Sequence, residues 1–77
     1  MKIKLLSAET NLTSATTVSN ASVVRLYNSS PDTAIKVTNS NGNSTTMPAG
    51  SIAYVVKDPS ETLSGGALVL ATSIAHL

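Results

Sequence analysis

The stretch Pro48-Ala49-Gly50-Ser51-Ile52-Ala53-Tyr54-Val55-Val56-Lys57-Asp58-Pro59 has the pattern of a β-strand between two turns. Pro and Gly mark its start, and Asp58-Pro59 marks its end. Side chains of a strand alternate between two faces, so one face carries Ile52, Tyr54 and Val56 and the other carries Ala53 and Val55. Because both faces are apolar, we expect a central strand, with Ile52, Tyr54 and Val56 at the centre of the core.

Similar strand patterns cover residues 2–6, 22–28, 33–39, 44–47 and 67–75. Residues 22–28 and 33–39 predict an antiparallel hairpin with a loose loop, and Asn41-Gly42 predicts a type I′ turn before residues 44–47. Six to eight short strands, with turns about every 8–12 residues, predict an all-β fold, a small antiparallel β-sandwich or barrel. An open antiparallel sheet is the alternative.

The last strand pattern, residues 67–75, also admits a helix because Ala and Leu favour one. The preceding Gly65-Gly66 and the β-branched Val69 and Thr72 favour a strand. Taken over all strands, the side chains expected in the core are Val24, Leu26, Ile35, Val37, Ile52, Tyr54, Val56, Leu68 and Leu70, with Ile74 as a further inward residue.

The 77 residues have the length of a single domain, 1–77. Residues 7–21 are rich in Thr and Ser, and Leu12 and Val18 are their only sizeable apolar side chains. Two interpretations stay open for this region. It forms a short strand and loop, or residues 1–20 form an extended N-terminal arm that uses Leu12 and Val18 as contacts with a partner.

The apolar composition predicts a thin core, because the chain has no Phe and no Trp and only two Tyr. Domains of this size usually need disulfides, a metal or partner subunits for stability. The chain has no cysteine and one histidine, so disulfides and thiolate or multi-histidine metal sites within it are excluded. We therefore expect oligomerisation or docking on a larger surface.

The charged residues are few and scattered: five Lys or Arg and four Asp or Glu give a net charge of +1. The sequence lacks the basic stripe that is typical of nucleic-acid-binding proteins. Its longest apolar run is far shorter than the ~20 residues that a membrane span needs. Residues 1–8 are too short and too interrupted for a signal peptide, so we expect synthesis in a cytosol. Ser, Thr and Asn make up more than a third of the chain and favour a polar, nearly uncharged surface.

No motif of catalysis or cofactor binding is apparent. Asp58 and Glu61 are three residues apart and suit a capping pair, with Asp58 as the cap and Pro59 as the first residue of one helical turn. His76 has no partner for serine-hydrolase chemistry, because the chain contains no nucleophile-elbow motif. Gly65-Gly66 is not followed by the Lys-Ser or Lys-Thr pair of a phosphate-binding loop. We expect no catalytic residue, no metal site and no cofactor.

The order of features resembles that of the small all-β virion proteins of tailed phages, particularly marine and cyanobacterial phages. The segments that carry the resemblance are Met1-Lys2-Ile3-Lys4-Leu5-Leu6, Val23-Val24-Arg25-Leu26-Tyr27-Asn28, Ile35-Lys36-Val37, Met47-Pro48-Ala49-Gly50-Ser51, the run from Val56 to Leu63, and the final strand from Ala67 to Ala75.

The resemblance implies a non-enzymatic virion protein, made in the host cytoplasm. Within that class it favours a capsid decoration (cement) protein that binds the outer shell and stabilises it. The partner would be the major capsid protein or another virion protein, and the chain would form a homo-oligomer such as a trimer. A tail or head–tail adaptor subunit is one alternative. A small glycan- or host-binding module, with Tyr27 or Tyr54 as its platform, is another.

Overall fold

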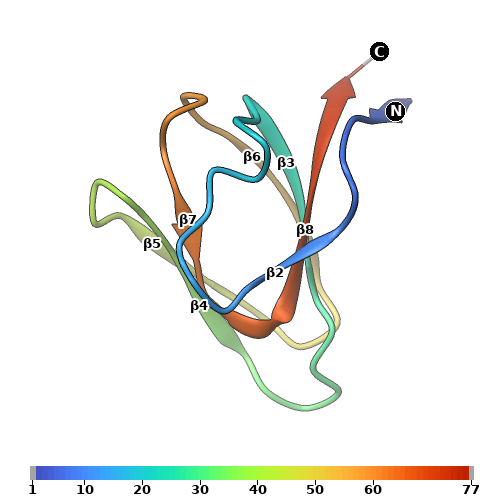
Figure 1. The fold of residues 1–77 in the computed structure, drawn as a ribbon. Coiled ribbons are helices and arrows are strands. Elements are labelled where there is room, and N and C mark those ends of the chain that lie inside the picture. Colours follow the sequence, from blue (N-terminus) through green and yellow to red (C-terminus); the bar gives the residue numbers. More distant parts are fainter. Residues whose placement is uncertain (1, 77) are drawn as a thin grey trace.

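The computed structural model describes residues 2–76, with side chains for residues 2–75. This part of the chain contains eight strands joined by loops and turns, and no helix (Figure 1). The strands are β1 (Ile3–Leu5), β2 (Thr10–Leu12), β3 (Val23–Asn28), β4 (Ile35–Asn39), β5 (Ser44–Met47), β6 (Ile52–Val56), β7 (Leu63–Ser64) and β8 (Gly66–His76). The predicted all-β class and number of strands are confirmed, and residues 67–75 form a strand.

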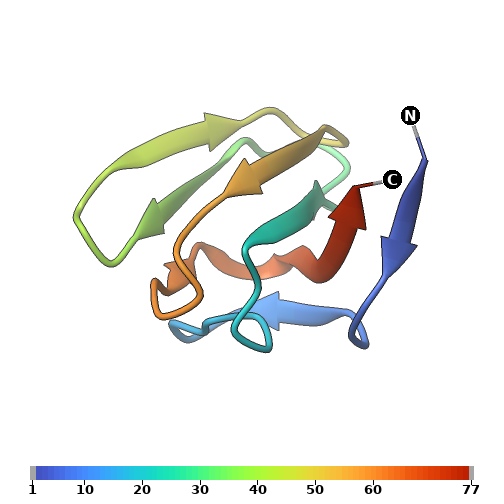
Figure 2. The same ribbon diagram turned by 90° about the horizontal axis from the view of Figure 1, so that it is seen from above.

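The strands form two antiparallel sheets on opposite sides of the core (Figures 1 and 2). The larger sheet has the order β1-β8-β3-β6, with β2 also paired to β8, and the smaller has the order β5-β4-β7. On one side the sheets are linked by a bridge in which Thr16 and Leu63 exchange backbone hydrogen bonds of 3.1 and 2.9 Å. On the other side β5 and β6 each end their sheet, so the sandwich is open there.

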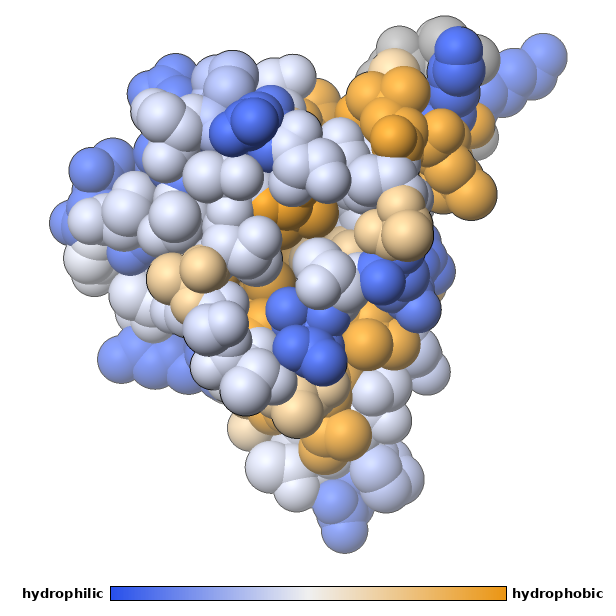
Figure 3. All heavy atoms as spheres, viewed as in Figure 1, coloured by the Kyte–Doolittle hydropathy of each residue, from blue (hydrophilic) through white to orange (hydrophobic). Residues whose placement is uncertain are grey.

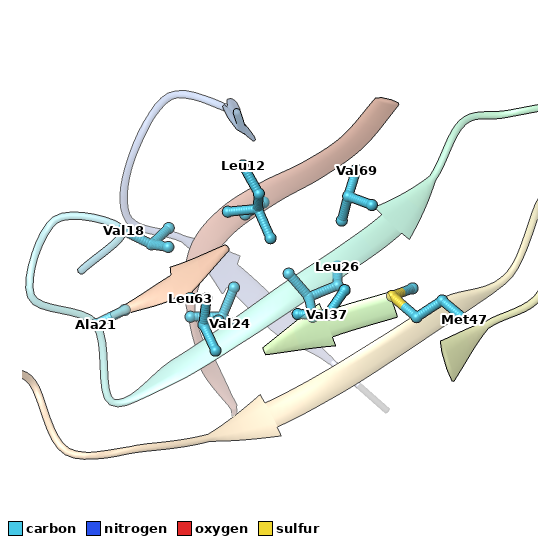
Figure 4. Packing of buried hydrophobic residues seen from close by; sticks show 10 residues of the cluster. Leu12, Val18, Ala21, Val24, Leu26, Val37, Met47, Leu63 and Val69 are labelled. Atoms are coloured by element: carbon cyan, nitrogen blue, oxygen red, sulfur yellow. The ribbon is translucent and has the colours of Figure 1, made fainter. Parts of the chain in front are cut away.

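Small and medium aliphatic side chains fill the space between the sheets and point toward one another (Figure 4). The buried cluster consists of Leu12, Val18, Ala21, Val24, Leu26, Val37, Met47, Leu63, Val69 and Ala71, with Ile35, Ala53 and Val55 packed against it. The structure thus places Val24, Leu26 and Val37 in the core, as expected from the sequence, and Ile35 at its margin.

The central position and the orientation predicted for β6 are both wrong, because β6 is an edge strand that pairs only with β3 among the described strands. Ile52, Tyr54 and Val56 are 50%, 46% and 82% exposed. The register explains the reversal, because Val24 lies opposite Val55 and Leu26 lies opposite Ala53. Directly opposite residues share a face of the sheet, so the inward side chains of β3 bring Ala53 and Val55 of β6 inward.

The same register argument corrects the prediction for β8. Leu26 lies opposite Ala71, so the inward side chains of β8 include Val69 and Ala71. Leu68 is 48% exposed, and Leu70 is half-buried on the outer side. Ile74 is buried, but it alternates with the inward residues as Leu68 and Leu70 do and lies outside the core cluster; its partner across the sheet is Leu5 of β1.

The predicted hairpin between residues 22–28 and 33–39 does not form. Strand β3 pairs with β6 and β8, whereas β4 pairs with β5 and β7 in the other sheet. The chain crosses between sheets at Asn28, which is fully buried. Its side-chain amide donates to the carbonyl oxygens of Thr33 and Met47, both at 3.0 Å, and its side-chain oxygen accepts from the Ser30 N–H.

The turn between β4 and β5 is present, but it is not of type I′. Positive φ occurs at Gly42 (85°) and not at Asn41, and the Gly42 N–H donates to the carbonyl of Asn39. This is the pattern of a three-residue loop that ends in a left-handed residue. The side-chain oxygen of Asn39 accepts from the N–H groups of Asn41 and Asn43 and holds the loop closed.

The interpretation of Leu12 and Val18 as partner contacts is also wrong, because both are buried in the chain's own core. Strand β2 pairs with β8, and Val18 enters the core from a turn in which Val18, Ser19 and Asn20 all have positive φ, of 54°, 60° and 55°. Side-chain hydroxyls stabilise this left-handed turn: Thr16 accepts from the Val18 N–H and Thr17 from the Asn20 N–H.

Candidate functional site

Four of the six large apolar side chains that are exposed in the described part of the chain lie on the outer side of the larger sheet. We define the outer face as the outward side chains of its three adjacent strands β6, β3 and β8: Ile52, Tyr54, Val56, Val23, Arg25, Tyr27, Leu68 and Leu70. Monomeric proteins seldom expose contiguous apolar patches of this kind, which usually mark a binding surface.

Both tyrosines of the chain lie on the outer face beside the one arginine. Tyr54 is directly opposite Arg25 on β3, and Tyr27 is directly opposite Ile52. The Arg25 guanidinium carbon lies 6.0 Å from the centre of the Tyr27 ring, the outer limit of a cation–π contact. Sequence reasoning treated the two tyrosines separately. The register brings them to one face, with a single positive charge between them.

The free edge of β6 adjoins the outer face. Among the described strands, β6 pairs only with β3. Hydrogen bonds from Lys57 N–H to Ser22 O and from Asn28 N–H to Ser51 O continue that pairing at both ends. Bonded residues alternate along an antiparallel strand, so the N–H and C=O groups of Ile52, Tyr54 and Val56 point to the free edge.

The two edges of the larger sheet differ in their protection. Lysine and proline on an edge strand discourage pairing with other chains. Strand β1 carries Lys4 and is preceded by Lys2, which disfavour pairing of its edge with the same edge of another copy. Strand β6, with the sequence Ile-Ala-Tyr-Val-Val, has neither a charge nor a proline.

A pocket of about 210 Å³ opens on the β5–β6 side of the sandwich. Its apolar lining is Val37, Val55 and Leu63, and its polar lining is Asn39, Asn43, Ser44 and Thr45. Val37 and Leu63 also belong to the core cluster, where Figure 4 shows them. The lining residues come from four strands in both sheets, so no local pattern in the sequence could identify the pocket.

Lys57 directly follows β6 and is only 7% exposed. Its Nζ donates to the carbonyl oxygens of Ala21, at 2.7 Å, and Asp58, at 3.3 Å. Burial lowers the pKa of Lys57, and the negative charges of Glu61 and Asp58 oppose that shift in part. The ammonium group ties the end of β6 to the loop before β3, so it has a structural role here.

Asp58 and Glu61 form a turn, but not the helical turn expected. The Glu61 N–H donates to the Asp58 carbonyl at 2.9 Å, and a Glu61 carboxylate oxygen accepts from the Asp58 N–H at 3.0 Å. Glu61 is therefore the acceptor side chain, in place of Asp58. Within residues 2–75, no three His, Cys, Asp or Glu side chains gather as metal ligands. The side chain of His76 lies outside the described residues.

No family model, curated protein or solved structure matches the chain. The described residues also include no helix of the length and hydropathy that a membrane span requires. The arrangement itself offers an apolar, weakly charged face with two aromatic rings, next to an unprotected strand edge. Such a surface is suited to docking on another macromolecule.

Proposed function

We propose that the chain is a non-enzymatic structural subunit of a tailed-phage virion, a capsid decoration protein that docks on the outer shell through the outer face. The observation that carries the proposal is the exposure of Ile52, Tyr54 and Val56, which include the two largest side chains of β6, Ile52 and Tyr54, while Ala53 and Val55 face the core. Burial of these three side chains on a shell would contribute at most roughly 1.5–3 kcal/mol each, since Ile52 and Tyr54 are already half-buried, and this is before the cost of association.

Symmetry makes a modest interface sufficient. A shell offers a decoration protein many equivalent binding sites. When the copies of an oligomer bind several of these sites at once, the overall affinity rises although each copy makes the same contacts. The partner is accordingly the major capsid protein. The resemblance to small virion proteins supports this role over that of an isolated binding domain.

The test is co-sedimentation of the purified chain with expanded empty capsids of the phage that encodes it. We expect saturable binding in many copies per shell, and Tyr54→Glu should abolish it. Lys36→Glu, an exposed substitution in the other sheet, is the matched control and should leave binding intact. Saturation at a handful of copies would instead favour a tail or head–tail adaptor subunit.

A second candidate, a glycan-binding module, rests on the position of Tyr27 and Tyr54 on either side of Arg25. Aromatic rings beside a hydrogen-bonding guanidinium provide a stacking surface for a sugar ring. This function requires saturable glycan binding by an isolated monomer and its loss in Tyr27→Ala. A chain that binds shells but no glycan excludes it.

A further inference from the structure

We propose that the N-terminal segment of a second copy, residues 2–6, pairs along the free edge of β6 and places an apolar side chain in the pocket between β5 and β6. The proposal rests on the proposed role as an assembly subunit and specifies how the copies are joined. It uses the strand edge and the pocket, which leaves the outer face available for a shell.

In this pairing the N-terminal segment leaves β8 of its own chain, because the backbone groups of Lys4 and Leu6 that would meet β6 face β8 in the single chain, where the Leu6 N–H donates to the Ser73 carbonyl at 2.8 Å. Strand β1 pairs with β8 over three residues, and Leu5 and Leu6 are 67% and 55% exposed. Figure 3 shows apolar side chains gathered where this segment projects from the body. The sequence Lys2-Ile3-Lys4-Leu5-Leu6 alternates apolar and charged residues over its first four positions, as a strand that covers one apolar face requires.

The free edge of β6 matches this segment in length and pattern. In an antiparallel pairing with Lys4 opposite Tyr54, the backbone groups of Ile52, Tyr54 and Val56 that point to the edge meet those of the arm. Ile3 then lies opposite Val55 and Leu5 opposite Ala53, on the inner side. The pocket next to Val55, at about 210 Å³, exceeds the ~150 Å³ that holds benzene, so it accommodates the Ile3 side chain.

Charge complementarity selects the antiparallel direction. This register places Lys2 opposite Val56, next to the turn that carries Asp58 and Glu61. Asp58 is exposed, and both carboxylates lie on the side of Val56 away from Tyr54 along the chain. A parallel arrangement would move Lys2 to the Ile52 end and lose this attraction. Pairing between two β6 edges would bring no opposite charges together within the strands.

A disulfide cross-link tests the pairing, because the chain has no cysteine of its own. Within one chain β1 and β6 are separated by β8 and β3, or roughly 14 Å at the usual strand spacing, and a disulfide needs Cα atoms within about 7 Å. A cross-link between positions 4 and 54 therefore reports on two copies. Lys4→Cys and Tyr54→Cys chains are prepared separately, mixed and oxidised, and mass spectrometry identifies the mixed product.

We expect the mixed Lys4→Cys and Tyr54→Cys product to form, and to be lost when the Lys4→Cys chain also carries Ile3→Asp. Lys36→Cys in place of Tyr54→Cys is the control and should give no mixed product. Absence of the mixed product, or cross-linking of Tyr54→Cys to itself in preference, would overturn the proposal. If either of these results were found and the wild-type chain still bound shells, the strand pairing would be wrong and the decoration role would remain supported. The two proposals can therefore fail separately.

Discussion

Val24 on β3 lies directly opposite Val55 on β6, and both side chains face the core. This pairing determines the character of the molecule's exterior. It turns Ala53 and Val55 inward and leaves Ile52, Tyr54 and Val56 exposed, so the two largest side chains of β6, Ile52 and Tyr54, lie on the surface. A strand with this arrangement is suited to a partner that covers its outer side.

The orientation of the strands is tested by a matched pair of leucines. Leu26 is fully buried, whereas Leu68 is 48% exposed on the outer face. Leu26→Ala should destabilise the fold by about 2–5 kcal/mol, because it removes buried methyl groups and leaves a cavity. Leu68→Ala should cost about 1 kcal/mol or less. Urea denaturation measures both, and equal losses would contradict the register.

Asn28 is expected to be the most sensitive polar residue. Its side-chain amide serves the carbonyls of Thr33 and Met47 and approaches that of Pro48 at 3.3 Å. Asn28→Ala should cost at least about 3 kcal/mol, since buried carbonyls lose their donor. Asn28→Asp keeps the shape but cannot donate, so it should be as damaging at neutral pH. Asn43→Ala, at an exposed position, is the control and should remain within about 0.5 kcal/mol of wild type.

The left-handed turn before β3 predicts a stabilising substitution. Ser19 is exposed and has a φ of 60°, a conformation that disfavours residues with a Cβ atom. Ser19→Gly should raise the free energy of unfolding by about 0.5–1 kcal/mol, because the relief of strain exceeds the added entropy of the unfolded chain. Ser14→Gly, where φ is not positive, should give no such gain, and a gain of the same size there would contradict this reason.

The pH dependence of stability should include a contribution from Lys57. Burial sets its pKa in the folded chain below the ordinary value of 10.5, so between the two values the unfolded chain binds more protons. The free energy of unfolding therefore rises with pH between the folded-state pKa and 10.5, and it levels off above 10.5. Below the folded-state pKa, the cost of burying the charged ammonium is fully present. Lys57→Met lacks this dependence. The difference in unfolding free energy between wild type and Lys57→Met, measured against pH, should rise in that interval, and a flat difference would contradict the assignment.

The fold class and most strand positions follow from the sequence because they depend on local alternation and turn residues. The strand at Ile52–Val56 and the turn at Gly42 are examples. The buried face of β6 does not follow, because both of its faces are apolar and only its register with β3 distinguishes them. The outer face was missed for the same reason. The sequence left open whether Leu12 and Val18 contact a partner because their segment lacks periodicity, whereas the bridge between Thr16 and Leu63 fixes that segment against the core.

The most direct test of the outer face as a docking surface is the number of wild-type chains bound per expanded capsid at saturation, compared with Tyr54→Glu. We predict that the wild type saturates at a fixed multiple of the shell's symmetry-related sites and that Tyr54→Glu, with unchanged stability, stays in the supernatant. Equal binding by both chains, or no binding by the wild type, would contradict the account.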